Sequence, residues 1–189
     1  DEGGLNLGNN GVEHMTGAIV LARRGKSLRA QRLEALPPGT TTRVLERELP
    51  SIELADLMKL TAGMLEEQGL YAREATAMVN TWRESYFETD GLRVLYPLSR
   101  AQTDWLLPLY VSLAPRESVR VLVGRLDVLT PQVEQQALAA VARMQNAADA
   151  QRQFGRFALP LVQRLLVLAC EGRERDHVRE LAELLEQSF

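Results

Sequence analysis

AREATAMVNTWRESYFETDGLRVLYP, residues 72–97, is the stretch that decides the fold. Its first part predicts a helix over residues 72–87, because five apolar residues recur at helical spacing and form one stripe. These are Ala75, Met78, Val79, Trp82 and Tyr86. The turn at residues 89–91 ends the helix. Residues 92–96 are rich in strand-forming side chains and predict an interior strand that Pro97 ends.

The segment that follows predicts a short helix and a hairpin. Ser99 and Gln102 have the spacing of a capping box, so we expect a helix over residues 100–107. The apolar runs 109–113 and 119–129 flank a turn and predict two paired strands. Gly124 lies where the alternation of side chains changes phase, which suggests a β-bulge.

Residues 1–50 carry short apolar runs separated by turn residues. The turns are expected at residues 8–11, 24–26 and 36–39, and strands at 17–22, 27–33 and 40–49. This pattern predicts an antiparallel β meander. It contains too few strands for a complete sandwich.

The remaining segments predict helices. Ser51 is expected to cap a helix that ends at Gly69 and forms a helical hairpin with residues 72–87. Thr130 followed by Pro131 marks another helix start, and helices are expected over residues 131–153, 156–169 and 173–187. The predicted class is α+β: a partial sandwich over residues 1–50, a mixed unit with a helical hairpin and small sheet over 51–130, and C-terminal helices over 131–189.

Composition excludes several classes of protein. The chain of 189 residues has a net charge of −3, which argues against a dedicated nucleic-acid-binding protein. No apolar run is long enough to span a bilayer. Cys170 is the single cysteine, so no internal disulfide framework is possible, and we expect a buried structural thiol. The chain begins at Asp1 inside a β-like region, so we expect it to be a fragment of a longer precursor.

Two parts of the chain resemble known groups of proteins. The segment LNLGNNG, the strands after it and the turn LPPGTTT resemble the rear half of immunoglobulin-like β-sandwich modules of bacterial cell-envelope proteins, over residues 5–49. The segments TWRESYFE, GLRVLY and VGRLDVLTP resemble the C-terminal portion of uncharacterised secreted bacterial proteins. The resemblance implies that the absent front of the sandwich comes from a missing N-terminal segment, from a protein partner, or from the strands around Val94 and Val121.

One charged cluster is a candidate catalytic site, because carboxylates near aromatic rings can have raised pKa values and act as general acids. Its members are Glu84, Glu88, Asp90, Arg93, Arg100, Asp104 and Arg125. The alternative interpretation is a set of structural ion pairs at the ends of helices and strands. His14 and His177 have no second ligand at a suitable spacing, so we expect no metal site and no cofactor.

A second candidate site lies at the apolar residues after the capping box. Trp105 and Tyr110 flank Leu106, Leu107 and a proline, and could anchor a protein partner. Core packing of the same aromatic residues is the alternative.

These observations predict a non-catalytic structural or protein-interaction module of the cell envelope, periplasmic or extracellular, that is part of a larger assembly or precursor. Oligomers are possible. The alternative is a hydrolase-type enzyme that uses the carboxylate and arginine cluster within residues 84–125. A cytoplasmic scaffold is a third possibility.

Overall fold

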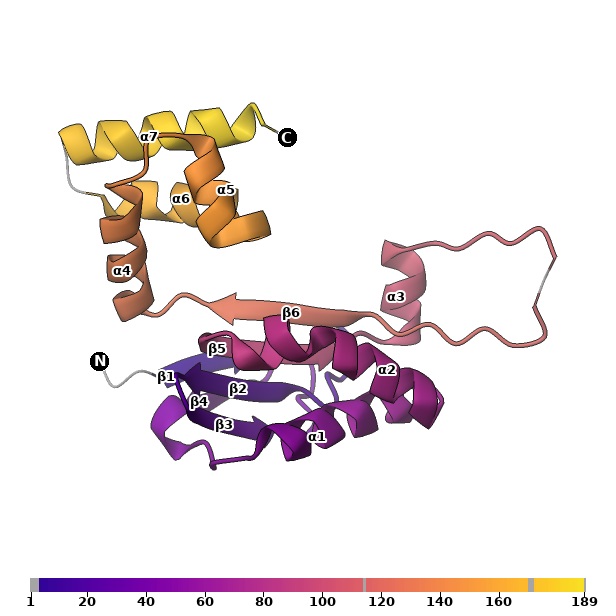
Figure 1. Ribbon diagram of the computed structural model, residues 1–189. Helices are drawn as coiled ribbons and strands as arrows, with labels where there is room; N and C mark the ends of the chain where they lie inside the picture. The colour runs from indigo at the N-terminus through magenta and orange to yellow at the C-terminus, as the bar shows by residue number, and fades with distance from the viewer. Residues whose placement is uncertain (1–3, 114, 170–171, 189) are drawn as a thin grey trace. The chain divides into compact units, whose positions relative to one another are not determined.

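The computed structural model describes residues 4–113, 115–169 and 172–188. The chain has the predicted α+β class and forms two compact units, residues 1–128 and residues 129–189 (Figure 1).

Unit 1 is built on a four-stranded antiparallel sheet. It contains β2 (Ile19–Arg24), β3 (Ser27–Arg32), β5 (Gly91–Pro97) and β6 (Val123–Val128) in the order β3-β2-β5-β6. β1 (Gly4–Gly8) and β4 (Thr41–Leu45) pair in a separate two-stranded sheet. The N-terminal strands are therefore divided between two sheets, and the strand around Val94 is the neighbour of β2.

Two layers cover the four-stranded sheet. On one face lie α1 (Leu54–Glu67) and α2 (Ala72–Trp82), which continues as the π-helix η2 (Arg83–Glu88). On the other face lies the β1–β4 sheet. Side chains alternate between the two faces along β5, as the period of a strand requires. Leu95 packs with Leu57 and Phe87 on the helical side, and Val94 packs with Leu49 on the other.

Three local predictions for unit 1 were wrong. Residues 109–113 form no strand, so the predicted hairpin is absent. Gly124 pairs with Tyr96 in an unbroken register, so it forms no bulge. Ser51 does not cap α1, whose N-cap residue is Glu53, because residues 50–52 follow the outer edge of β3. There the amide of Ala30 donates to the carbonyl oxygen of Pro50 at 3.0 Å.

The capping box was predicted correctly. α3 (Arg100–Leu106) begins after Ser99, whose hydroxyl oxygen accepts from the amide of Gln102 at 3.2 Å. The side-chain oxygen of Gln102 accepts from the amide of Ser99 at 3.1 Å. A short 3-10 turn, η1 (Glu46–Glu48), follows β4.

Unit 2 is helical. It contains α4 (Pro131–Val141), α5 (Ala147–Phe154), the 3-10 turn η3 (Gly155–Phe157), α6 (Ala158–Leu168) and α7 (Arg173–Glu186). Thr130 caps α4 as predicted. The expected helix over residues 131–153 is instead interrupted after Val141, and Asn146 caps α5. The core of the unit includes the fully buried Val141, Val162, Leu165, Val178 and Leu185.

Candidate functional site

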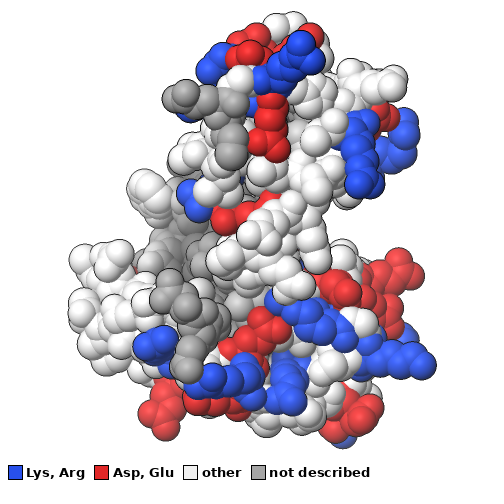
Figure 2. Space-filling model, turned by 90° about the vertical axis from the view of Figure 1, so that its left-hand side faces the viewer, with Lys and Arg blue, Asp and Glu red and all other residues white. Residues whose placement is uncertain are grey.

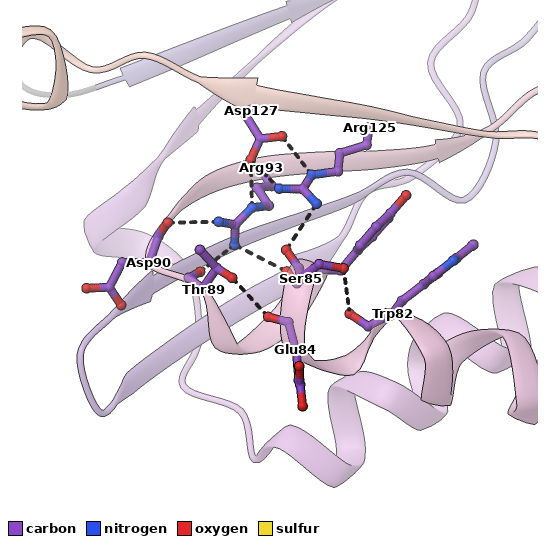
Figure 3. A network of polar contacts seen from close by, with 9 residues as sticks. Trp82, Glu84, Ser85, Thr89, Asp90, Arg93, Arg125 and Asp127 are labelled. Carbon is purple, nitrogen blue, oxygen red and sulfur yellow. Dashed lines mark hydrogen bonds and ion pairs between the residues drawn. The ribbon is translucent and has the colours of Figure 1, made fainter. Parts of the chain in front are cut away.

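Arg93 is the buried centre of the predicted charged cluster. It projects from β5 toward the helical layer, and its side chain is 2% exposed. Its Nε donates to Asp127 Oδ1 at 2.7 Å, across the pair that Arg93 and Asp127 form in the β5–β6 register. Its other donors reach the carbonyl oxygens of Tyr86, Thr89 and Asp90 at 3.2, 2.6 and 2.8 Å (Figure 3).

These carbonyl groups lie where the helix ends and the chain turns into β5. The last carbonyl groups of a helix have no partner within the helix, and an arginine supplies several donors in a fixed fork. Arg93 therefore fastens the end of η2 and the turn after it to the sheet.

Arg125 joins the same network from β6. Its Nε and Nη2 donate to the two oxygens of Asp127 at 2.6 and 2.9 Å, and its Nη1 donates to the carbonyl oxygen of Ser85 at 3.0 Å (Figure 3). Its guanidinium carbon lies 4.6 Å from the centroid of the Tyr86 ring, and that ring stacks on Trp82 with a centroid distance of 4.8 Å. The network thus also orients the aromatic side chains of the helix.

Burial and charge act against each other in this network. Burial favours a raised pKa for Asp127, but the hydrogen bonds and positive charges of Arg125 and Arg93 outweigh it, so the pKa of Asp127 is lowered. Burial also lowers the pKa of Arg93, an effect that the hydrogen bond and charge of Asp127 oppose. Because both oxygens of Asp127 accept from guanidinium groups, this carboxylate is held ionised.

Asp90 contacts Arg93 through its backbone carbonyl oxygen, and its carboxylate accepts from the amide of Gly25 at 2.9 Å. The remaining predicted members form separate contacts. Glu88 forms an ion pair with Arg83 at 3.0 Å, and Glu84 is exposed. On α3, Asp104 pairs with Arg100 at 3.5 Å and with Arg120 at 3.0 Å. The cluster is therefore divided into separate groups.

Sequence reasoning missed Asp127 and Arg120. The signal for Asp127 was its spacing of two residues from Arg125, which places both side chains on one face of a strand. Arg120 lies in an irregular segment, where no periodicity marks its contacts.

The residues of the second candidate site are exposed. Trp105 is 80% exposed and Tyr110 is 92% exposed, so neither packs in the core of unit 1. Leu106 and Leu107 are about half exposed, at 48% and 51%. Together with residues 108–113, which include Leu113 at 84%, they form an exposed segment without a charged residue, here called the apolar arm (residues 105–113).

A polar hollow of about 450 Å³ lies beside α3 and contains Arg100 in its wall. Other wall residues include Glu13, His14, Gln68 and Tyr96. The loop after β1 forms one wall of the hollow and is held in place by the buried Asn9. The side chain of Asn9 donates to the carbonyl oxygens of Glu13 and Leu36 at 2.7 and 2.8 Å.

The described residues contain no group of three or more His, Cys, Asp or Glu side chains arranged to hold a metal ion. His14 lines the polar hollow. His177 is half-buried, with Nε2 at 3.1 Å from the carbonyl oxygen of Val141. Cys170 lies outside the described residues.

Two further observations concern the surface. In Figure 2, basic and acidic side chains are interspersed where charged residues are drawn. Among the described residues, no helix combines the length and the apolar character that crossing a membrane requires.

No family model, no curated protein and no solved structure matches this chain.

Proposed function

We propose that this chain is a non-catalytic protein-interaction module whose contact surface is the apolar arm. The observation that carries the proposal is the exposure of Trp105, Tyr110 and Leu113 within one uncharged segment, residues 105–113. Contiguous exposed apolar residues mark interaction sites, and aromatic side chains contribute a large share of the energy of protein interfaces.

The base of the arm is held in place, which supports a binding role. Arg120 donates from Nη2 to the carbonyl oxygen of Leu107 and from Nη1 to Asp104 at 3.0 Å. α3, whose last two residues begin the arm, is fixed by its capping box at Ser99. A surface that is positioned before binding loses less conformational entropy when the partner arrives.

The resemblance of residues 5–49 to immunoglobulin-like envelope modules leads us to place this interaction in a cell-envelope assembly. In that proposal the partner binds the arm, and the chain is one part of a larger assembly or precursor. The carboxylate and arginine cluster has a structural role here, because Arg93 is fully engaged by Asp127 and by backbone carbonyl groups.

The test is photo-crosslinking in the host cell. A benzophenone amino acid replaces Tyr110 in one variant and Val12 in the other; these two apolar residues are 92% and 91% exposed. We expect a covalent adduct in the envelope fraction from position 110 and none from position 12. Equal adducts from both positions, or none from position 110, would contradict the proposal, and an adduct confined to the cytoplasm would contradict the envelope location.

A further inference from the structure

The apolar arm contains a sequence that favours a strand but has no strand partner. Residues 109–113 read LYVSL, with an aromatic and a β-branched residue at its centre, and such residues are enriched in strands. Residues 107–113 and 115–122 contain neither helix nor strand. Irregular segments of this length inside a compact domain are uncommon, and binding loops are one of the recurrent reasons for them.

β6 is an edge strand of the four-stranded sheet, with β5 as its neighbour on one side. Proteins commonly protect such edges with proline, bulges or outward-pointing charges. β6 contains no proline, its register with β5 is unbroken, and the side chains of Arg125 and Asp127 are engaged in the network around Arg93. On the opposite face of the strand, Leu126 is 46% exposed. Among the described residues, no strand pairs with the outer edge of β6.

The arm is poorly placed to pair with β6 of its own chain. Residues 115–122, which connect the arm to β6, are held beside α3. Arg120 bonds Asp104, and the carbonyl oxygen of Leu122 accepts from the amide of Leu98 at 2.8 Å. In Figure 1 the loop between α3 and β6 extends beyond α3, away from the sheet. To lie along its own β6, the arm would have to reverse its direction directly after α3.

We infer that two copies of this chain exchange arms: residues 109–113 of each copy add as a fifth strand beside β6 of the other. This inference rests on the proposed function, since it names the partner of the same arm. Each chain carries both complementary elements, so a two-fold dimer makes two equivalent contacts and leaves neither element open. The uncharged segment also avoids repulsion between like charges when two copies meet.

The first test is sedimentation velocity of the purified chain from about 1 to 100 μM, a range that covers weak and moderate affinities. We expect a monomer–dimer equilibrium. Val111→Pro removes the amide donor in the middle of the added strand, and Leu126→Lys places a charge on the edge; each is expected to weaken dimerisation at least about tenfold. Val111 is in no helix or strand, so this substitution leaves the monomer folded.

The matched control is Val12→Lys, which removes a residue that is 91% exposed in the loop before β2. It is expected to leave the dimerisation constant unchanged. A monomer at every concentration, or equal weakening by Val12→Lys and Val111→Pro, would overturn the inference.

The second test locates the contact. Isotopically labelled and unlabelled chains with the benzophenone group at position 110 are mixed and irradiated, and we expect mixed-mass adducts that map to residues 123–128 of the second copy. Adducts at other residues would overturn strand exchange. If the purified chain stays monomeric but position 110 captures a different protein in cells, this inference fails and the proposed function stands; if neither adduct forms, both fail.

Discussion

The ring of Tyr96 lies against the backbone of Gly124, its partner in the β5–β6 register. A Cβ atom at residue 124 would lie 2.7 Å from the Tyr96 hydroxyl oxygen and still nearer to ring carbons. Glycine is therefore required at this position by the neighbouring ring and not by a bulge.

We expect Gly124→Ala to destabilise unit 1 by roughly 1–3 kcal/mol, because the added methyl group forces the Tyr96 ring from its place. The measurement is urea unfolding followed by tryptophan fluorescence, which reports on unit 1 because both tryptophans, Trp82 and Trp105, lie there. In a chain that already carries Tyr96→Ala, Gly124→Ala should lower the free energy of unfolding much less. Additive effects of Tyr96→Ala and Gly124→Ala would show that the two residues do not interact.

Arg93→Leu should destabilise unit 1 by about 3–5 kcal/mol, as removal of one partner of a buried ion pair typically does. It also leaves three backbone carbonyl groups at the end of η2 without their donor. Arg93→Lys should recover only part of this loss, because an ammonium group cannot reproduce the planar fork.

The matched control for Arg93 is Arg100→Leu. The side chain of Arg100 is 70% exposed and lies 3.5 Å from Asp104, so its loss should change stability by less than about 1 kcal/mol. Similar urea midpoints for the Arg93 and Arg100 variants would contradict the central role of Arg93.

Asp127 should make the stability of unit 1 sensitive to acid. Its pKa is lower in the folded chain than its usual value of about 3.9. The folded state therefore binds this proton more weakly than the unfolded state, and the stabilisation is present above pH 4 and is lost as the pH falls through the folded pKa. The urea midpoint of unfolding should therefore decrease as the pH is lowered from about 6 to about 2.5.

Asp127→Asn should flatten that decrease, since the titrating group is gone, although stability at neutral pH falls as well. Asp104→Asn, at an exposed pair on α3, is the control and should keep the acid dependence of the wild-type chain. An unchanged dependence of the urea midpoint on pH in Asp127→Asn would refute the assignment of the acid sensitivity to Asp127.

Asn9→Ala should cost about 2–3 kcal/mol, because it leaves buried polar groups without partners. The side chain of Asn9 is buried, donates to two carbonyl oxygens, and accepts from the amide of Gly11 at 3.0 Å. Hydrogen exchange in residues 11–16 should also become faster. Asn10→Ala alters an exposed neighbour and should change stability by less than about 0.5 kcal/mol.

A helix cap was predicted correctly where its bonding partners are close in the sequence, and incorrectly where a distant segment binds the same residues. The capping box at Ser99 and the N-cap at Thr130 were predicted because a cap bonds residues two or three positions away. The cap at Ser51 failed because residues 50–52 pair with residues 28–30 of β3, twenty or more positions away. Of the charged candidates, Arg93 and Arg125 were identified from the sequence, but Asp127 was not.

The sequence by itself determined the α+β class, the amphipathic helix over residues 72–87 and the strand at Val94. These features follow from the period of apolar side chains and from local bonding, which a single segment contains. The tertiary structure alone decided the neighbours of each strand, the four acceptors of Arg93, the contact between Tyr96 and Gly124, and the exposure of the apolar arm. Each of these depends on which distant segments meet, and sequence spacing does not encode that pairing.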